Sequence, residues 1–262
     1  SLKEFLMSEA LEISSEIKSQ VSKEEWKTRE DLAAAYRLVA NYGWDDMVFT
    51  HLSARVPGPD EHFLLNPFGI LFEEVSASSL VKIDLDGATV LENGYEVNAA
   101  GFTIHSAIHG ARQDAQAVMH LHTDSGVAIS SMEEGFLPLN QHAMFVYHDL
   151  AYHDWEGVAL NLDERERLVA DLGQKNLMML RNHGTLAVGG SIASCFMRLY
   201  FFERACTIQA KAMNGTPNMP NKDAISMMKE TFNNPDSWER IATTAWPAMK
   251  RLADRLDPSY AE

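Results

Sequence analysis

The sequence predicts an α/β domain, on three observations: apolar residues recur at helical spacing in several long segments, short apolar runs stand between turn residues, and the composition supports a large core. The chain has 262 residues, of which 46% are hydrophobic, enough for one compact domain. It contains no internal repeat, low-complexity tract or Gly/Ser linker. We therefore expect residues 1–262 to form a single domain with helical additions at both ends.

Helices are predicted where apolar residues recur every three or four positions and capping residues stand at the ends. The segment Lys23–Asn41 carries Leu32, Tyr36 and Val39 at this spacing. Gly43 follows it and suits a C-terminal cap. By the same criteria we expect helices over residues 98–112, 123–131, 163–172, 191–212, 222–231 and 237–256.

Strands are predicted where short apolar or β-branched runs are separated by turn pairs such as Asp86-Gly87. The run Ala117–Met119 leads directly into His120 and is typical of a buried strand. Further strands are expected over residues 47–56, 63–65, 81–84, 89–91, 143–146, 158–160, 177–180 and 185–188. Helical and strand patterns thus alternate along the chain, as in an α/β protein.

The histidines of the strand that ends near residue 122 are the main candidate functional residues. His120 and His122 are two positions apart, so on a strand their imidazoles point to the same face and could share one metal ion. His183, in the segment Arg181–Thr185, is a third candidate ligand. The competing interpretation is that these are buried histidines that only form hydrogen bonds.

Charge and cysteine content narrow the possible partners. The net charge of −15 disfavours nucleic acid and anionic membrane surfaces, because both are negatively charged. No apolar run approaches the roughly 20 residues that span a bilayer. Cys195 and Cys206 are about 16 Å apart along a predicted helix, too far for a disulfide, so we expect reduced core thiols. These features predict a cytoplasmic protein that binds neither nucleic acid nor membrane.

Several motifs, in order and spacing, resemble the class II aldolase/adducin family over about residues 24–212. They are Thr50–Arg55 (THLSAR), Asn66–Ile70 (NPFGI), His105–Ile108 followed by Arg112 and Asp114, His120–His122, and Leu180–Gly184 (LRNHG). The resemblance implies a three-layer α/β/α fold with a largely antiparallel central sheet. It also implies a homotetramer with sites at subunit boundaries, and one divalent metal ion on His120, His122 and His183. Zinc is the expected ion, with manganese or another first-row metal as alternatives.

The chain departs from sugar-phosphate aldolases at the residues that define that activity. Gly101 stands where those enzymes carry a glutamate base, and Ala99-Ala100 replace hydroxyl side chains that cradle phosphate. Phe68 stands at the place of a phosphate-side threonine, and His51 replaces an asparagine. Aromatic rings and methyl groups offer a phosphate dianion no directed donors. We therefore expect a substrate that is not phosphorylated.

Other residues in the matching motifs are candidates for chemistry or substrate binding. By resemblance, His142 falls where a tyrosine of a neighbouring subunit donates a proton, a role that histidine can fill near neutral pH, although it could equally be an exposed loop residue. His51, Gly69 and Arg181 are candidate substrate-binding residues, with a structural ion pair as the alternative for Arg181. His105 is one helical turn from Gly101 and could project beside it.

Two classes of function follow from these residues. The retained histidines favour a metal-dependent carbon–carbon lyase, of aldolase or decarboxylase type, that acts on a small, oxygen-rich, carboxylated metabolite. The segments His105–Ile108 and Tyr152–Gly157 are closer to the adducin head domains, which favours a non-catalytic module that binds cytoskeletal partners such as actin. A small-molecule sensor that uses the same pocket is a third interpretation. We further expect Glu203 to be a surface or interface charge.

Overall fold

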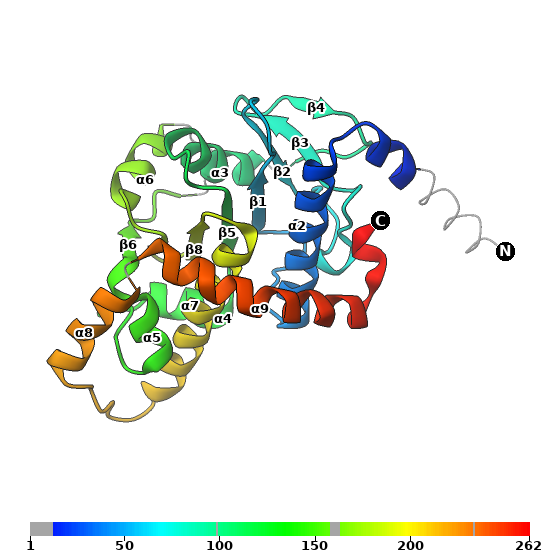
Figure 1. Ribbon diagram of the computed structural model, residues 1–262. Helices are drawn as coiled ribbons and strands as arrows, with labels where there is room; N and C mark the ends of the chain where they lie inside the picture. Colours follow the sequence, from blue (N-terminus) through cyan, green and yellow to red (C-terminus); the bar gives the residue numbers. More distant parts are fainter. Residues whose placement is uncertain (1–12, 98, 158–162, 233) are drawn as a thin grey trace.

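The computed structural model describes residues 13–97, 99–157, 163–232 and 234–262 (Figure 1). Within these residues, the strands form one eight-stranded sheet in the order β4-β3-β2-β1-β5-β8-β7-β6. The strands are β1 (His51–Arg55), β2 (His62–Leu65), β3 (Val81–Asp84), β4 (Thr89–Leu91), β5 (Ala117–Leu121), β6 (Leu150–His153), β7 (Leu177–Leu180) and β8 (Gly184–Gly189). β1 and β5 are at the centre of the sheet.

Helices account for most of the remaining described chain. They are α2 (Lys23–Asn41), α3 (Ala99–Ala111), α4 (Asp124–Ser130), α5 (Gln141–Val146), α6 (Glu164–Leu172), α7 (Ile192–Ala212), α8 (Lys222–Phe232) and α9 (Pro235–Leu256), with short 3-10 turns η1 (Phe72–Glu74), η2 (Tyr147–Asp149) and η3 (Pro258–Ala261). None of the helices in the described ranges is both long and apolar enough to cross a membrane.

The pairing of the strands is antiparallel except between β6 and β7. β6 and β7 run parallel because α6 connects them as a crossover, whereas β7 and β8 are joined by a tight hairpin. The largely antiparallel sheet confirms the expected fold class.

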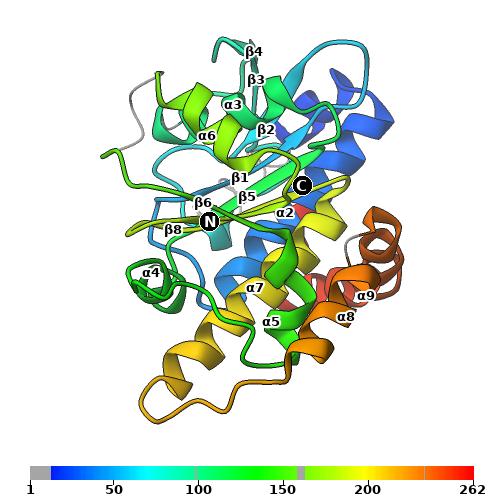
Figure 2. The ribbon, with the colours of Figure 1, turned by 90° about the vertical axis from the view of Figure 1, so that its left-hand side faces the viewer.

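The helices cover both faces of the sheet, which makes three layers. Figure 2 shows α3 and α6 on one side and α7, α8 and α9 on the other. Alternate residues of β5 separate the two cores: Val118 packs in the cluster with Ile104 and Ile108 of α3, whereas Met119 packs in the larger cluster that contains residues of α2 and α7. His120 shares the parity of Val118, so it lies on the α3 face.

Several predicted boundaries agree closely with the structure, one predicted strand is wrong, and one observed strand was not predicted. α2 spans Lys23–Asn41 as expected, and its N-cap Ser22 accepts a hydrogen bond from the amide of Glu25. The predicted strand 143–146 is wrong: these residues belong to α5, because Asn140 caps the amide of Ala143 and turns the chain into a helix. The strand β6 was not predicted. The predicted strand 158–160 and Asn98, the first residue of the helix predicted over 98–112, lie outside the described residues.

Helix α7 forms the core beneath the central strands. The side chains of Phe196, Leu199 and Phe202 on this helix are completely buried. Cys195 and Cys206 are buried free thiols, which agrees with the prediction of unpaired core cysteines. α7 packs against β8, and the chain passes from Gly189 at the end of that strand into the helix.

Gly189, where the chain leaves β8 and approaches α7, should not tolerate a larger residue. A Cβ at Gly189 would lie 2.5 Å from the amide nitrogen and 2.6 Å from the Cβ of Cys195, and the backbone atom cannot move without displacing α7. We expect Gly189→Ala to lower the free energy of unfolding by about 2 kcal/mol or more. Chemical denaturation measures this. Gly215→Ala is the control, because a Cβ there would lie 3.9 Å from its nearest neighbour, the carbonyl oxygen of Ala212. Equal effects of the two substitutions would contradict the packing described.

Candidate metal centre

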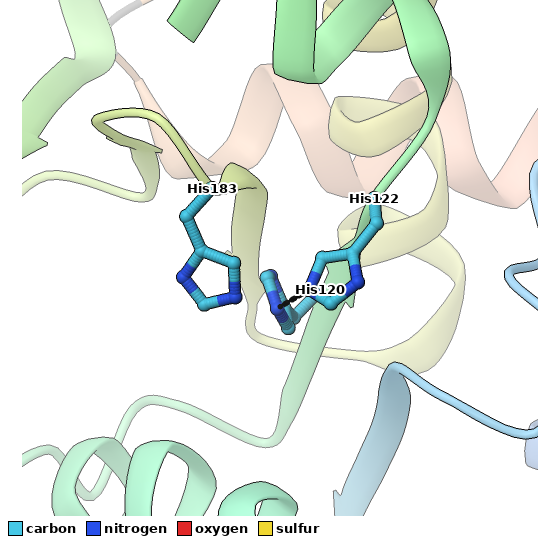
Figure 3. A group of neighbouring side chains, drawn as sticks. All are labelled: His120, His122 and His183. Carbon is cyan, nitrogen blue, oxygen red and sulfur yellow. Dashed lines mark hydrogen bonds between the residues drawn. The ribbon is translucent and has the colours of Figure 1, made fainter. Parts of the chain in front are cut away.

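Three imidazoles converge at one end of β5 (Figure 3). His120 lies on β5, His122 directly follows this strand, and His183 is in the turn that joins β7 to β8. Asn182 takes a left-handed conformation in this turn, with φ of 57°, which asparagine tolerates better than most residues. The turn therefore brings a histidine from a distant part of the sequence to the two histidines of β5.

The separations of the three rings suit one divalent ion. The Nε2 atoms of His120 and His122 are 2.9 Å apart, and the His183 ring centroid lies 4.7 Å and 4.8 Å from theirs. One ligand atom from each residue fits within a group no wider than 4.8 Å. Two nitrogens bound tetrahedrally at 2.0–2.1 Å would be separated by about 3.3 Å, so small ring movements suffice. The residues fit a three-histidine site with open positions for a ligand.

Hydrogen bonds on the outer side of two rings direct their Nε2 atoms inward. Nδ1 of His120 donates to the carbonyl oxygen of Thr185 over 2.9 Å, and Nδ1 of His122 donates to Asp46 over 3.0 Å. Such contacts fix the tautomer that leaves a lone pair on Nε2 for a metal. The site is thus oriented by its surroundings.

The environment also keeps the ligands in the neutral form that metals require. Burial, followed by the neighbouring His183 and His122, lowers the pKa of His120 well below its ordinary value. Burial and then His122 lower the pKa of His183 to about 4. Both rings are therefore unprotonated near neutral pH.

Behind the ligands, Glu203 contacts Thr123, which follows His122, and Thr185 of β8, so the expectation of a surface or interface charge is wrong. This residue of α7 is fully buried, and its carboxylate accepts hydrogen bonds from the hydroxyls of Thr123 and Thr185. Thr123 follows His122, and Thr185 provides the carbonyl that orients His120. Burial raises the pKa of Glu203 to about 6, although the two threonine hydrogen bonds oppose this shift.

A second group of histidines lies beside the metal site on the α3 face. His51 of β1 pairs directly opposite His120 of β5, and the ring centroids are 6.3 Å apart. His105 of α3 meets the His51 ring edge-on at 5.6 Å. Gly101 lies next to the same ring. The structure thus brings His51 and His105 to the site.

The remaining candidates are not assembled with the three histidines in one chain. His142 lies on α5, and its ring is 5.8 Å from that of Phe201 on α7. The guanidinium of Arg181 stacks over Tyr152 and donates to the carbonyl of Met132. Gly69 is in an exposed turn after β2, with φ of 88°. Their roles in chemistry or substrate binding remain predictions.

A cleft of about 480 Å³ opens onto His122. Its lining includes Asp46, Asp124 and Arg204, together with the aromatic side chains of Tyr42 and Trp44. Clefts of this size accommodate small metabolites.

Sequence reasoning missed Asp46, the carbonyl of Thr185 and the buried role of Glu203. Asp46 gives no signal, because one acidic residue before a strand is common on surfaces. Glu203 could have been found, since it follows the apolar run Leu199–Phe202 in the middle of a buried helix. A charged residue in such a position requires partners.

The fold and the three converging imidazoles define an α/β protein with a candidate metal centre, and comparisons with known proteins identify its family. The model of the Class II Aldolase and Adducin N-terminal domain matches residues 30–210. The chain belongs to this family. A Caulobacter vibrioides protein whose name places it with the class 2 aldolases is 54% identical over 247 residues, which cover 94% of this chain and 96% of that protein. Alpha-adducin of Mus musculus is 37% identical over 241 residues, 86% of this chain but 32% of that protein.

Solved structures show the same relationship. The crystal structure of an aldolase II superfamily protein from Pseudomonas syringae has a TM-score of 0.88 and 47% identity, and the match covers 94% of this chain and 99% of that one. The L-fuculose 1-phosphate aldolase from Glaciozyma antarctica PI12 has a TM-score of 0.80 and 29% identity, with 91% and 93% covered. Class II aldolase architecture therefore extends over nearly the whole chain.

The buried carboxyl of Glu203 should make the stability of the metal-free protein depend on pH. Because its folded pKa is raised to about 6, the folded state binds the proton more tightly, so this contribution is fully present below pH 4.5 and is lost as the pH rises through 6. Glutamine does not titrate, so the wild type should lose about 2 kcal/mol of unfolding free energy relative to Glu203→Gln when the pH rises from 4.5 to 7. Urea denaturation across this range measures it. Parallel pH profiles would contradict the buried environment.

Proposed function

We propose that the protein is a metal-dependent carbon–carbon lyase, of aldolase or decarboxylase type, that acts on a small, oxygen-rich, carboxylated and non-phosphorylated metabolite. The observation that carries the proposal is the convergence of His120, His122 and His183, because hydrogen bonds on the outer side of the first two rings direct their Nε2 atoms inward. Membership of a family that includes aldolases supports it. We propose zinc as the ion, with manganese or another first-row metal as alternatives.

The proposed chemistry breaks a carbon–carbon bond next to a carbonyl group. A divalent ion on the three histidines supplies electrostatic stabilisation of the negative charge that develops on the carbonyl oxygen. The bonding electron pair remains on the fragment that carries the carbonyl, and a proton delivered to this fragment completes the product. The other fragment leaves as carbon dioxide in a decarboxylation, or as an aldehyde or ketone after its hydroxyl group has lost a proton to solvent in a retro-aldol cleavage. We assign that proton to the imidazole of His142.

The location of His142 favours a site shared between subunits. Within one chain its imidazole packs against Phe201 of α7 rather than beside the three histidines, so we propose that it acts on the site of a neighbouring copy. This arrangement requires a homo-oligomer, and we propose a tetramer. The buried free thiols of Cys195 and Cys206 are compatible with a reducing, cytoplasmic compartment.

The phosphate-binding equipment of a sugar-phosphate aldolase is absent from the positions considered. The side chain at residue 68 is a half-exposed phenylalanine, which offers an anion no hydrogen-bond donor. Gly101 has no side chain, and the ring of His51 lies against it. These features favour a substrate without phosphate.

Metal content tests the first part of the proposal. Removal of two of three imidazoles leaves too few ligands to hold an ion, so we expect near-stoichiometric zinc in the wild type and a loss of nearly all of it in His120→Ala/His122→Ala. Elemental analysis after dialysis measures it. His62→Ala, a histidine of β2 outside the group, should keep its metal. Equal metal content in all three proteins would place the ion elsewhere.

Turnover tests the lyase assignment against the non-catalytic alternatives. With small hydroxy and oxo acids and zinc supplied, we expect His122→Ala to abolish product formation without unfolding the protein. His142→Phe should lower kcat about 100-fold or more and leave the metal in place, because only the proton donor is lost. Full activity after chelation would reject the mechanism. Ligand binding without turnover would favour a sensor, and neither binding nor turnover would favour an adducin-like module.

A further inference from the structure

A second cavity lies at the opposite end of the sheet from the three histidines. It is a groove of about 470 Å³ between α2, α9 and the start of α7. The groove meets Gln116 just before β5, whereas His120 lies four residues further along that strand, about 13 Å away at 3.3 Å per residue. The groove is therefore separate from the candidate metal centre, and the proposed function makes no use of it.

Much of the wall of this groove is apolar. Ile192 of α7 and Ala242 and Trp246 of α9 line it. The indole N–H of Trp246 donates to Asp31 over 3.4 Å, which holds the aromatic ring in one orientation. A fixed aromatic ring beside aliphatic side chains suits the carbon skeleton of an organic ligand.

One carboxylate of the groove, that of Glu239 on α9, has no basic partner. Its Oε2 accepts the hydroxyl proton of Ser191 over 3.0 Å. Its Oε1 lies beside Gly190, where an added Cβ would come within 3.2 Å of it. In the described part of the chain, no Lys, Arg or His nitrogen lies within 4.0 Å of this carboxylate, and Oε1 receives no hydrogen bond. Glu239 therefore presents a free anionic acceptor to the groove.

The other charged side chains of the groove are engaged elsewhere. Lys27 pairs with Asp31 over 2.8 Å. The guanidinium of Arg55 donates to the carbonyl of His109 and lies over the ring of Phe63, which places it on the α3 side of the sheet. The charge of Glu239 is thus the one left unpaired among the described residues that line the groove.

A proline in α9 adds a second acceptor to the same wall. Pro247 has no N–H, so the carbonyl oxygen of Thr243, four residues earlier, lacks its helical donor. Both residues line the groove, and Thr243 is one helical turn from Glu239. The hydroxyl of Thr243 is itself occupied, because it donates to the carbonyl of Glu239 over 2.8 Å. The free polar atoms of this wall therefore favour a ligand that is positively charged and donates hydrogen bonds.

We propose that this groove is a binding site for a small organic ammonium ion with an apolar carbon skeleton. The ammonium group donates to Oε1 of Glu239, and the skeleton packs against Trp246 and Ala242. The site needs neither the metal ion nor the proposed lyase activity, so a failure of either proposal is recognised separately.

Benzylammonium and benzyl alcohol are matched probes, because they share an aromatic skeleton and differ in charge. Calorimetric titration of the full chain should show at least about tenfold tighter binding of benzylammonium, since a hydrogen bond to a charged group is stronger than one to a neutral group. His120→Ala/His122→Ala should bind it with the same affinity. Loss of binding in that variant would place the amine on the metal ion and overturn the proposal. Equal affinities of the two probes for the wild type, or no binding of either, would also overturn it.

Glu239→Gln tests the carboxylate itself. Glutamine keeps an acceptor for the Ser191 hydroxyl and removes the charge, so the affinity for benzylammonium should fall about tenfold. Glu230→Gln is the matched control, because it removes a charge from the exposed surface of α8, and it should change the affinity less than about twofold.

Gly190→Ala tests the position of the carboxylate without changing its charge. The added methyl group would lie 3.2 Å from Oε1 and should shift it, so we expect binding of benzylammonium to weaken about threefold or more. Circular dichroism verifies that each variant is folded. Wild-type affinity in both Glu239→Gln and Gly190→Ala would overturn the proposal.

Discussion

The register of β5 between β1 and β8 is the constraint on which the site depends. Pairing with β1 places His120 opposite His51, and pairing with β8 places it opposite Leu186, next to the Thr185 carbonyl that orients its ring. A shift by one residue would turn His120 to the α7 face and replace it with an aliphatic side chain. The geometry of the candidate metal centre therefore depends on strand pairing as well as on the individual ligands.

The interactions behind the ligands preserve that register. The buried carboxylate of Glu203 accepts hydroxyl protons from Thr123, beyond β5, and from Thr185, on β8. It thus ties the ends of two strands to one helix at the point where the imidazoles emerge. Burial of a carboxyl group is costly, and its pKa of about 6 reflects this cost. Such a buried carboxyl group is typical of sites where supporting hydrogen bonds hold functional side chains in a fixed position.

The two faces of the sheet differ in the composition of the cores that they cover. The α7 side contains the larger apolar core, whereas the α3 side combines a smaller core with the buried chain of Ser53, His105 and His109. His51 is the point at which this polar chain approaches the metal ligands. The absence of a side chain at Gly101 is thus compensated from a different strand.

Local patterns predicted what depends on local sequence. The helix Lys23–Asn41 was predicted to the residue because its apolar spacing and its caps agree. The pair His120 and His122 follows from strand alternation, and motif resemblance added His183. Residues 143–146 were wrongly predicted as a strand, since a short apolar run suits a strand or a buried helix.

Contacts that depend on tertiary packing could not be predicted from the sequence. Asp46 reaches His122 across 76 positions, and no periodicity encodes that distance. The approach of His51 to Gly101 likewise exists only because α3 packs over β1. Sequence reasoning recognised that a side chain was missing at 101, but only the folded chain identifies the ring that occupies the space.

X-ray absorption spectroscopy of the zinc-loaded protein would test the central claim most directly. A metal centre built on His120, His122 and His183 predicts three imidazole nitrogens at about 2.0–2.1 Å, with the remaining coordination from light atoms of solvent or ligand. Addition of a small hydroxy acid, the ligand class proposed above, should change the light-atom shell and leave the three imidazoles in place. A spectrum with sulfur ligands, or with fewer than three imidazoles, would contradict the account.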